Sequence, residues 1–137
     1  MKEAIVFLRK RGRVAFATVD LENKPRVRTM EIMKVSDTHL WFATSPNKEV
    51  YSQLLTNPNV ELLAMDGDIS VRVSGKVEFD VTDSLGKDIY ETNPVLQRLY
   101  KDHKELVYFS LQMNTVEYCD IAPTPPIYQM YTIKCKI

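Results

Sequence analysis

Hydroxyl, amide and basic side chains gather in one short stretch, Thr44-Ser-Pro-Asn-Lys48. A β-rich run ends at Thr44, and Ser45 followed by Pro46 is typical of a helix start, with Ser45 as the N-cap and Pro46 at the first helical position. The free amides of a helix start, two hydroxyls and the Lys48 ammonium would suit a phosphate group. The same residues would equally suit a capped helix whose lysine is merely solvated.

A second candidate stretch precedes the first and reads KPRVRTMEIMK over Lys24–Lys34. Strand alternation would place five of its side chains on one face: Arg26, Arg28, Met30, Ile32 and Lys34. Arginine favours planar, bidentate recognition of phosphate or carboxylate. Two arginines beside apolar side chains therefore predict an anionic ligand with a flat apolar part. Ordinary surface arginines on an exposed sheet face are the alternative.

Side chains that could do acid–base or nucleophilic chemistry form no recognisable Ser-His-Asp or Cys-His arrangement. His39 and His103 are far apart and lack partners at metal-ligand spacing, so no metal site is expected. Asp83, Asp88 and Glu91 indicate a solvated helix face. Any chemistry is therefore expected from a cofactor.

Composition indicates an ordinary globular chain of 137 residues, with 45% hydrophobic and 26% charged residues. This length predicts one domain over residues 1–137. The formal net charge is zero, which argues against nucleic acid or an anionic membrane as partner despite the basic cluster at Arg9–Arg13. The apolar run Ala4–Leu8 is too short for a signal peptide, and Cys119 and Cys135 suggest no disulfide framework, so a cytoplasmic protein is expected.

The elements that must position these residues are mostly short strands. Strands are predicted at Val14–Asp20, Arg26–Val35, His39–Thr44, Val60–Met65, Ile69–Phe79 with a bulge at Gly75, Leu106–Met113, Thr115–Ile121 after a turn at Asn114, and at the edge over Ile127–Ile137. Helices are predicted over residues 2–11, from Ser45 to Asn57-Pro58, from Thr82 to Asn93-Pro94, and over Val95–Lys101. Hairpin-connected strands with few helices favour a closed or nearly closed antiparallel barrel.

Five motifs, in this order and spacing, resemble the pyridoxamine 5′-phosphate oxidase-like flavoproteins, and most of all their small, single-domain FMN-binding members. The motifs are Ala17-Thr-Val-Asp, Lys24-Pro-Arg-Val-Arg-Thr-Met, Phe42-Ala-Thr-Ser-Pro-Asn-Lys, Asn57-Pro-Asn-Val-Glu-Leu and Val71-Arg-Val-Ser-Gly-Lys-Val-Glu-Phe. The resemblance covers about residues 4–122. It implies a mainly β (α+β) fold, an antiparallel six- to seven-stranded split β-barrel with a few short helices, and a homodimer with FMN at the subunit interface.

The resemblance also implies which residues bind the cofactor. Arg26 and Arg28 would meet the phosphate or ribityl end, and the strand backbone at Val27, Thr29 and Met30 would lie along the flavin ring. The remaining set is Ala43, Thr44, Ser45, Asn47 and Lys48, of which the last four would hold the phosphate. Relatives in the superfamily use a deazaflavin or heme, which makes these the alternative cofactors.

The functional expectation is a flavin-dependent oxidoreductase whose substrate and electron donor stay open. The alternative is a non-catalytic flavin- or heme-binding module for storage, sensing or stress response. The tail from Pro123 to Ile133 lacks the arginine and histidine pattern with which the larger vitamin-B6 oxidases hold their product. Oxidation of pyridoxamine phosphate is therefore not expected of this chain.

Overall fold

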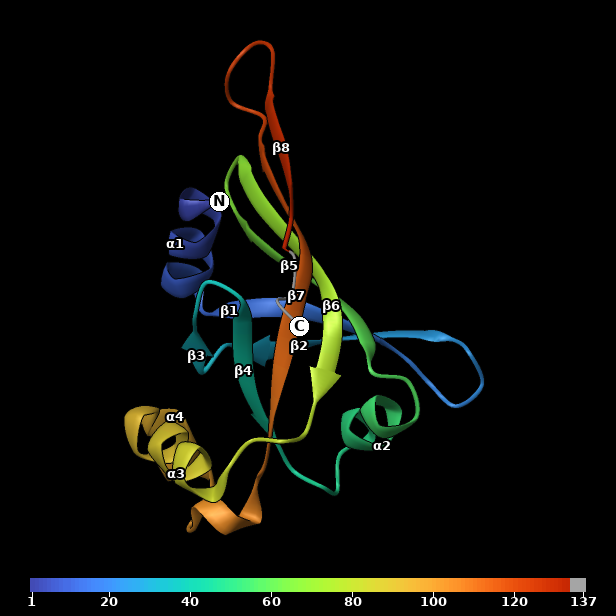
Figure 1. Ribbon diagram of the computed structural model, residues 1–137, viewed down its shortest axis with the longest axis vertical. Coiled ribbons are helices and arrows are strands. Elements are labelled where there is room, and N and C mark those ends of the chain that lie inside the picture. The colour runs from blue at the N-terminus through green and yellow to red at the C-terminus, as the bar shows by residue number, and fades with distance from the viewer. Residues whose placement is uncertain (134–137) are drawn as a thin grey trace.

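A computed structural model describes residues 1–133, and its strands form one antiparallel sheet that curls into a half-barrel (Figure 1). The elements are α1 (Lys2–Arg11), β1 (Arg13–Val19), β2 (Pro25–Glu31), β3 (Lys34–Val35), β4 (His39–Thr44), α2 (Glu49–Thr56), β5 (Asn59–Asp66), β6 (Ile69–Glu78), α3 (Asp83–Thr92), α4 (Pro94–Leu99), the short 3-10 helix η1 (His103–Glu105), β7 (Val107–Asp120) and β8 (Ile127–Thr132). The strand order is β2-β1-β5-β6-β7-β4-β3, and β8 is added beside β7. The predicted mainly β split barrel with short helices is confirmed.

The core lies on the inner face of the curled sheet. Phe16, Phe42 and Phe109 are fully buried there, with ring centroids 5.1 to 6.1 Å apart. Helix α1 adds Ala4, Ile5 and Leu8 to the same cluster, and these are the three apolar positions of its amphipathic pattern. As predicted, α1 spans residues 2–11, and it is capped by Gly12, whose φ of +72° suits a glycine after a helix end.

A smaller apolar cluster lies where α3 and α4 pack together at the lower end of the molecule in Figure 1. Its buried members are Ile89, Leu96 and Leu106, and Trp41 and Tyr108 pack against them from the sheet. Helix α3 begins where predicted, because Thr82 Oγ1 accepts a hydrogen bond from the Leu85 amide at 3.2 Å.

The start of α2 differs from the prediction. The helix begins at Glu49 with Lys48 at the N-cap position, so Ser45 is not the cap and Pro46 does not occupy the first helical position. Ser45 instead closes a turn of its own, with Oγ accepting from the Asn47 amide at 3.3 Å and its carbonyl from the Lys48 amide at 3.1 Å. A serine hydroxyl can stabilise such a turn as readily as a helix end, and here the turn prevails.

The strand predicted over Arg26–Val35 is also interrupted. β2 ends at Glu31, and the next amides leave its ladder: Ile32 N donates to Gly12 O at 2.6 Å and Met33 N to Trp41 O at 2.8 Å. Lys34 then pairs with Trp41 and its ammonium lies 5.6 Å from the centre of the indole ring. Lys34 therefore does not share the inner face with Arg28 and Met30, because the break at 32–33 resets the alternation.

The turn predicted at Asn114 is wrong, since β7 runs unbroken from Val107 to Asp120. Ser74 pairs with Thr115 and Gly75 with Met113, so Asn114 is the extra residue of a bulge. The bulge and close approach predicted at Gly75 are confirmed, because a Cβ there would lie 2.0 Å from the Gln112 carbonyl oxygen.

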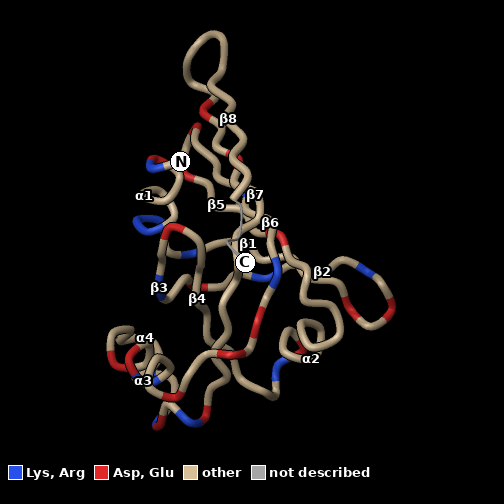
Figure 2. Tube along the Cα trace, viewed as in Figure 1, with Lys and Arg blue, Asp and Glu red and all other residues tan. Residues whose placement is uncertain are grey.

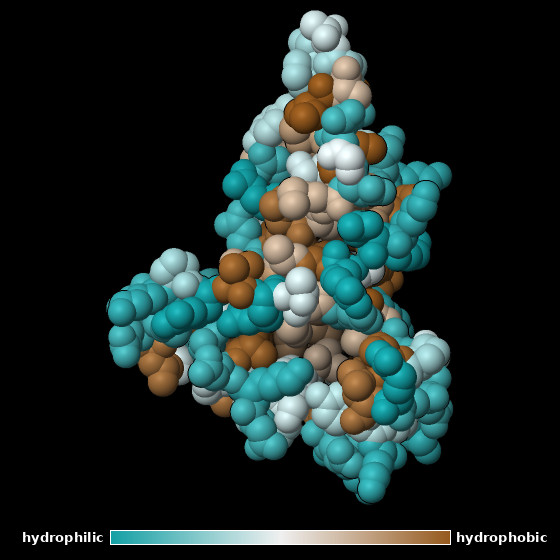
Figure 3. All heavy atoms as spheres, turned by 180° about the vertical axis from the view of Figure 1, so that it is seen from behind, coloured by the Kyte–Doolittle hydropathy of each residue, from teal (hydrophilic) through white to brown (hydrophobic). Residues whose placement is uncertain are grey.

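The β7–β8 hairpin projects beyond the barrel as an arm at the top of Figure 1. Ile121, Ile127 and Met130 are exposed on this arm, and brown apolar spheres stand among teal ones there in Figure 3. The predicted edge strand is confirmed over Ile127–Thr132, while its last residues, 134–137, lie outside the described part of the chain.

None of the helices within residues 1–133 has the length and apolar character needed to cross a membrane.

Candidate functional site

Arg28 links the second candidate stretch to the helix that follows the first. It stands opposite Phe16 in the β1–β2 ladder, on the inner face of the sheet. Nη1 donates to Thr18 Oγ1 at 2.7 Å and to the Phe16 carbonyl at 3.3 Å, and Nη2 donates to Gln53 Oε1 at 2.7 Å. The guanidinium therefore joins β1 and β2 to α2.

Gln53 is a residue that the sequence reasoning missed. Helix α2 turns Val50, Gln53 and Leu54 inward, and Gln53 is only 5% exposed. The four-residue spacings of Val50 with Leu54 and of Tyr51 with Leu55 predict the inward face of this helix. Val50 and Leu54 are buried as predicted, but Leu55 is 57% exposed. The i, i+3, i+4 spacing from Val50 was the available signal, and it was overlooked because residue 53 is polar.

The charge of Arg28 has an unusual setting for this protein. Other sheet arginines face carboxylates, with Arg13 2.8 Å from Glu31, Arg26 2.9 Å from Asp20, and Arg72 bridging Glu61 and Glu117. Arg28 is partly buried and forms no ion pair within residues 1–133, and the oxygens that accept its hydrogen bonds are all neutral.

Burial acts on this uncompensated charge. It lowers the pKa of the Arg28 guanidinium, while the nearby Glu49 carboxylate acts in the opposite direction. A guanidinium nevertheless stays protonated in proteins. A cation withdrawn from water without a counter-ion costs free energy, and an anionic ligand would offset that cost.

Arg26, which was predicted to act together with Arg28, is instead paired with a carboxylate. It is exposed, and its guanidinium binds Asp20, which also accepts the amides of Glu22 at 2.8 Å and Lys24 at 2.9 Å. The Lys24 amide, followed by Arg26, lowers the pKa of Asp20. Arg26 therefore helps to hold the β1–β2 hairpin, whose tip carries both signs of charge in Figure 2.

The residues of the β4–α2 junction differ in exposure. Thr44 is 4% exposed at the end of β4, Ser45 is partly buried, and Asn47 and Lys48 are exposed. No hydrogen bond or ion pair among residues 1–133 joins Arg28 to this junction directly. The connection runs through α2, whose first residue, Glu49, acts on Arg28 electrostatically and whose Gln53 binds it.

The other predicted site residues fall on both faces of the sheet. Val27, 68% exposed, and Thr29 lie on the outer face of β2, whereas Met30 packs against the inner core. Ala43 packs against the smaller cluster near α3. Arg28 and Met30 therefore face inward, whereas Val27 and Thr29 face outward.

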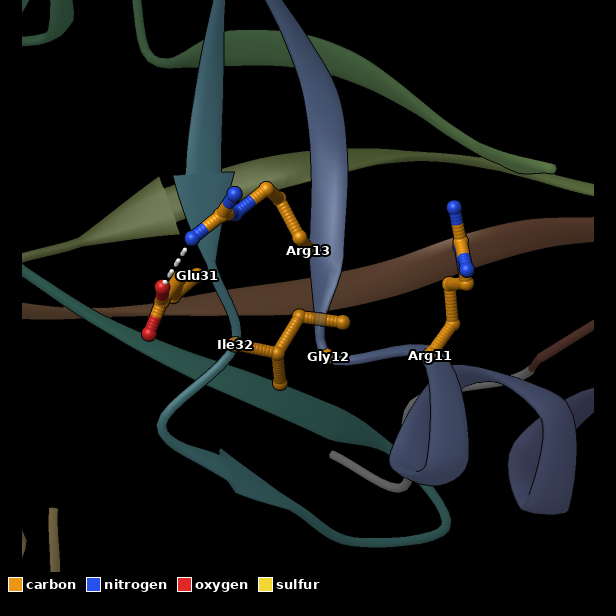
Figure 4. Close-up of a pocket in the computed structure, with 5 residues that line it drawn as sticks. All are labelled: Arg11, Gly12, Arg13, Glu31 and Ile32. Carbon is orange, nitrogen blue, oxygen red and sulfur yellow. Dashed lines mark hydrogen bonds and ion pairs between the residues drawn. The ribbon is translucent and has the colours of Figure 1, made fainter. Parts of the chain in front are cut away.

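Two of the arginine-lined hollows in the surface lie beside Gln53 or at the end of β2. One, of about 260 Å³, lies beside Gln53 and is lined by Asp20, Leu21, Glu22, Arg26, Glu49, Ser52 and Gln53. Another, of about 390 Å³, lies between the end of α1 and the end of β2 (Figure 4). Arg13 points toward Glu31 there, and Arg11 points away from them. Arg26 and Arg13 already have carboxylate partners, and Arg11 is exposed at the end of α1. Neither hollow is therefore lined by a partly buried arginine without an ion pair, which is the setting of Arg28.

Comparison with known proteins places this geometry in a family. Residues 1–120 match the family described as pyridoxamine 5′-phosphate oxidase. No curated protein matches the sequence.

Solved structures share the fold. A protein from Clostridium acetobutylicum related to general stress protein 26 superposes with a TM-score of 0.78 at 13% identity, covering 96% of this chain and 93% of its own. A heme binding protein from Mycobacterium smegmatis gives 0.76 at 15% identity, covering 95% and 56%. A pyridoxamine 5′-phosphate oxidase-related, FMN binding protein from Nostoc punctiforme gives 0.66 at 14% identity, covering 98% and 94%. With its split barrel and the match over residues 1–120, the chain belongs to the pyridoxamine 5′-phosphate oxidase family.

Proposed function

We propose that this protein binds FMN and acts as a flavin-dependent oxidoreductase. The observation that carries the proposal is Arg28, a partly buried guanidinium held only by neutral oxygens in a chain of this family. The planar fork of a guanidinium matches the oxygens of a phosphate, such as that of a phosphomonoester dianion. The FMN-binding relative from Nostoc punctiforme supports the same choice of cofactor.

The residues present fit the two ends of FMN. Arg28 would meet the phosphate, with the exposed Lys48 ammonium, the hydroxyls of Thr44 and Ser45 and the side-chain amide of Asn47 completing the anion site. The backbone of β2 at Val27, Thr29 and Met30 would support the ring, and Arg26 and Ala43 would flank the site. A bound flavin supplies hydride and electron transfer, so the chain's own part is binding, orientation and electrostatic tuning.

We favour a flavin over heme because the two histidines contact other residues and not the Arg28 site. His39 Nδ1 lies 2.7 Å from Thr38 Oγ1, and His103 lies between Asp83 and Asp102 at 3.3 and 3.1 Å. Neither is bonded to Arg28 or Gln53 within residues 1–133. Histidine is a common axial ligand of heme iron, and it is not offered at this anion site.

A homodimer is part of the proposal, with the cofactor at the subunit interface. Val27 and Met65 are exposed apolar residues, 68% and 58%, on strands of the same sheet. Burying such side chains against a second copy would be favourable. Sedimentation analysis should report a dimer, and Val27→Lys should shift it toward monomer while far-ultraviolet circular dichroism stays unchanged. A monomeric wild-type protein would contradict this part of the proposal.

The test of function begins with the purified protein. Absorbance and mass spectrometry of the co-purified material should identify FMN, and titration with FMN, the deazaflavin F420 and heme should give FMN the lowest Kd. Anaerobic bleaching of the flavin bands by NADH or NADPH, followed by turnover with an added acceptor, would support an enzyme. A Soret band or tighter binding of F420 would overturn FMN as the cofactor. A bound flavin that no donor reduces would overturn the oxidoreductase activity.

A further inference from the structure

We propose that Gln53 is a positioning residue that makes the Arg28 site selective for a phosphomonoester, with Thr18 as its partner. The inference rests on the proposed function and adds two residues to the expected site. Its basis is a closed set of three hydrogen bonds. Thr18 donates to Gln53 Oε1 at 2.6 Å, Arg28 donates to the same oxygen at 2.7 Å, and Arg28 donates to Thr18 Oγ1 at 2.7 Å.

Each group in this triangle determines the orientation of the other two. The amide oxygen of Gln53 receives both donors, so its carbonyl must face the sheet and its NH₂ must face away. Thr18 donates its single hydroxyl hydrogen to Gln53 and can therefore only accept a hydrogen bond from Arg28. Gln53 and Thr18 are 5% and 2% exposed, which leaves little access for water to replace these bonds.

The triangle holds Arg28 without neutralising it. A glutamate at position 53 could accept the same hydrogen bonds but would cancel the guanidinium charge, as Asp20 does for Arg26. The neutral amide leaves the full charge to an incoming anion. Arg28 also keeps N–H groups in reserve, because its three hydrogen bonds use fewer than the guanidinium carries.

Preorganisation is the expected benefit. A free arginine side chain loses rotamer entropy when it is fixed, and here folding has already fixed it before the ligand binds. The benefit applies only to ligands with a phosphate. Riboflavin, which has the same ring and ribityl chain without the phosphate, should be indifferent to Gln53.

The experiment compares FMN with riboflavin by fluorescence titration in matched variants. The wild type should bind FMN more tightly than riboflavin. Gln53→Leu should weaken FMN binding about tenfold or more, the effect of losing one hydrogen bond to a charged group, while riboflavin binding stays unchanged. Gln53→Glu should lose the same selectivity although it keeps the acceptor. Thr18→Ser, which keeps the hydroxyl, should behave as wild type.

Gln97→Leu is the matched control, because Gln97 lies on α4 and its side-chain amide donates to the carbonyls of Tyr90 and Glu91 on α3. If Gln53→Leu does not fold, Gln53→Glu and Thr18→Val carry the test, with folding checked by circular dichroism. Retained selectivity in Gln53→Glu, or equal loss of FMN and riboflavin binding, would overturn the positioning role and leave FMN binding standing. A wild type that binds neither flavin would overturn the proposed function and this inference together.

Discussion

Arg28 and Glu49 lie on β2 and at the start of α2, close enough for the carboxylate to favour the charged guanidinium, yet they form no ion pair within residues 1–133. The guanidinium is directed instead to Gln53 and Thr18. The Glu49 carboxylate should therefore repel the phosphate of a ligand that binds at Arg28.

Glu49→Gln should bind FMN more tightly than wild type, by about two- to fivefold, because it removes a like charge from the neighbourhood of the phosphate. The gain should shrink as salt is raised, since exposed charges are screened. Fluorescence titration at low and high ionic strength checks both points. Glu91→Gln on α3 is the control, and an unchanged FMN affinity in Glu49→Gln would contradict the placement of the phosphate beside α2.

Arg28→Ala combined with Lys48→Ala should release FMN and leave the fold intact. Each charge-assisted hydrogen bond contributes about 1.5–3 kcal/mol, so the double variant should lose at least about 100-fold in affinity. Gln53 and Thr18 keep each other as partners, so the barrel should still fold. Arg13→Ala, which removes an arginine paired with Glu31, is the control. FMN affinity equal to wild type in the double variant would contradict the site assignment.

Gly75→Ala should destabilise the protein severely, by about 3 kcal/mol or more, because its Cβ would lie 2.0 Å from the Gln112 carbonyl oxygen. Gly67→Ala is the comparison. Its Cβ would meet nothing within 4 Å, and only its φ of +58° is unfavourable, so a loss of about 1 kcal/mol is expected. Urea denaturation followed by circular dichroism measures both. Equal losses in the two variants would argue against the tight β6–β7 contact.

Asp20 should make the stability of the β1–β2 hairpin depend on acid pH. The Lys24 amide and Arg26 lower its folded-state pKa below the usual value of an aspartate. Its contribution is therefore present above the unfolded-state pKa and is lost as the pH falls through the lower folded-state value. Asp20→Asn should be less stable than wild type at pH 7, and the difference should vanish in strong acid. Thermal melts between pH 7 and pH 2 test this, with Asp88→Asn as control; a difference that does not change with pH would contradict it.

Local patterns were sufficient to predict most of the fold. The end of α1 at Gly12 and the cap of α3 at Thr82 follow from interactions within one turn, and both are confirmed. The alternation of β6, with Val71, Val73 and Val77 buried, depends only on the two-residue period of a strand.

The errors arose where a distant residue competes for a backbone group. β2 stops at Glu31 because Ile32 and Met33 donate to Gly12 and Trp41, which are remote in sequence. Asn114 resembles a turn residue, yet it is accommodated as a bulge because both neighbouring strands hold β7 in the sheet. Ser45 could cap a helix or a turn, and its local sequence allows both outcomes.

The sequence alone determined the residue types of the candidate site, its two stretches and the family that they resemble, because motifs and periodicity are properties of neighbouring residues. Only the tertiary structure decided that Arg26 is neutralised by Asp20 while Arg28 is held by Gln53 and Thr18. That distinction depends on strand register and on how α2 packs against the sheet, which bring together side chains from β1, β2 and α2. Two arginines that look equivalent in the sequence thus differ in the one property that matters to an anion, whether their charge is already compensated.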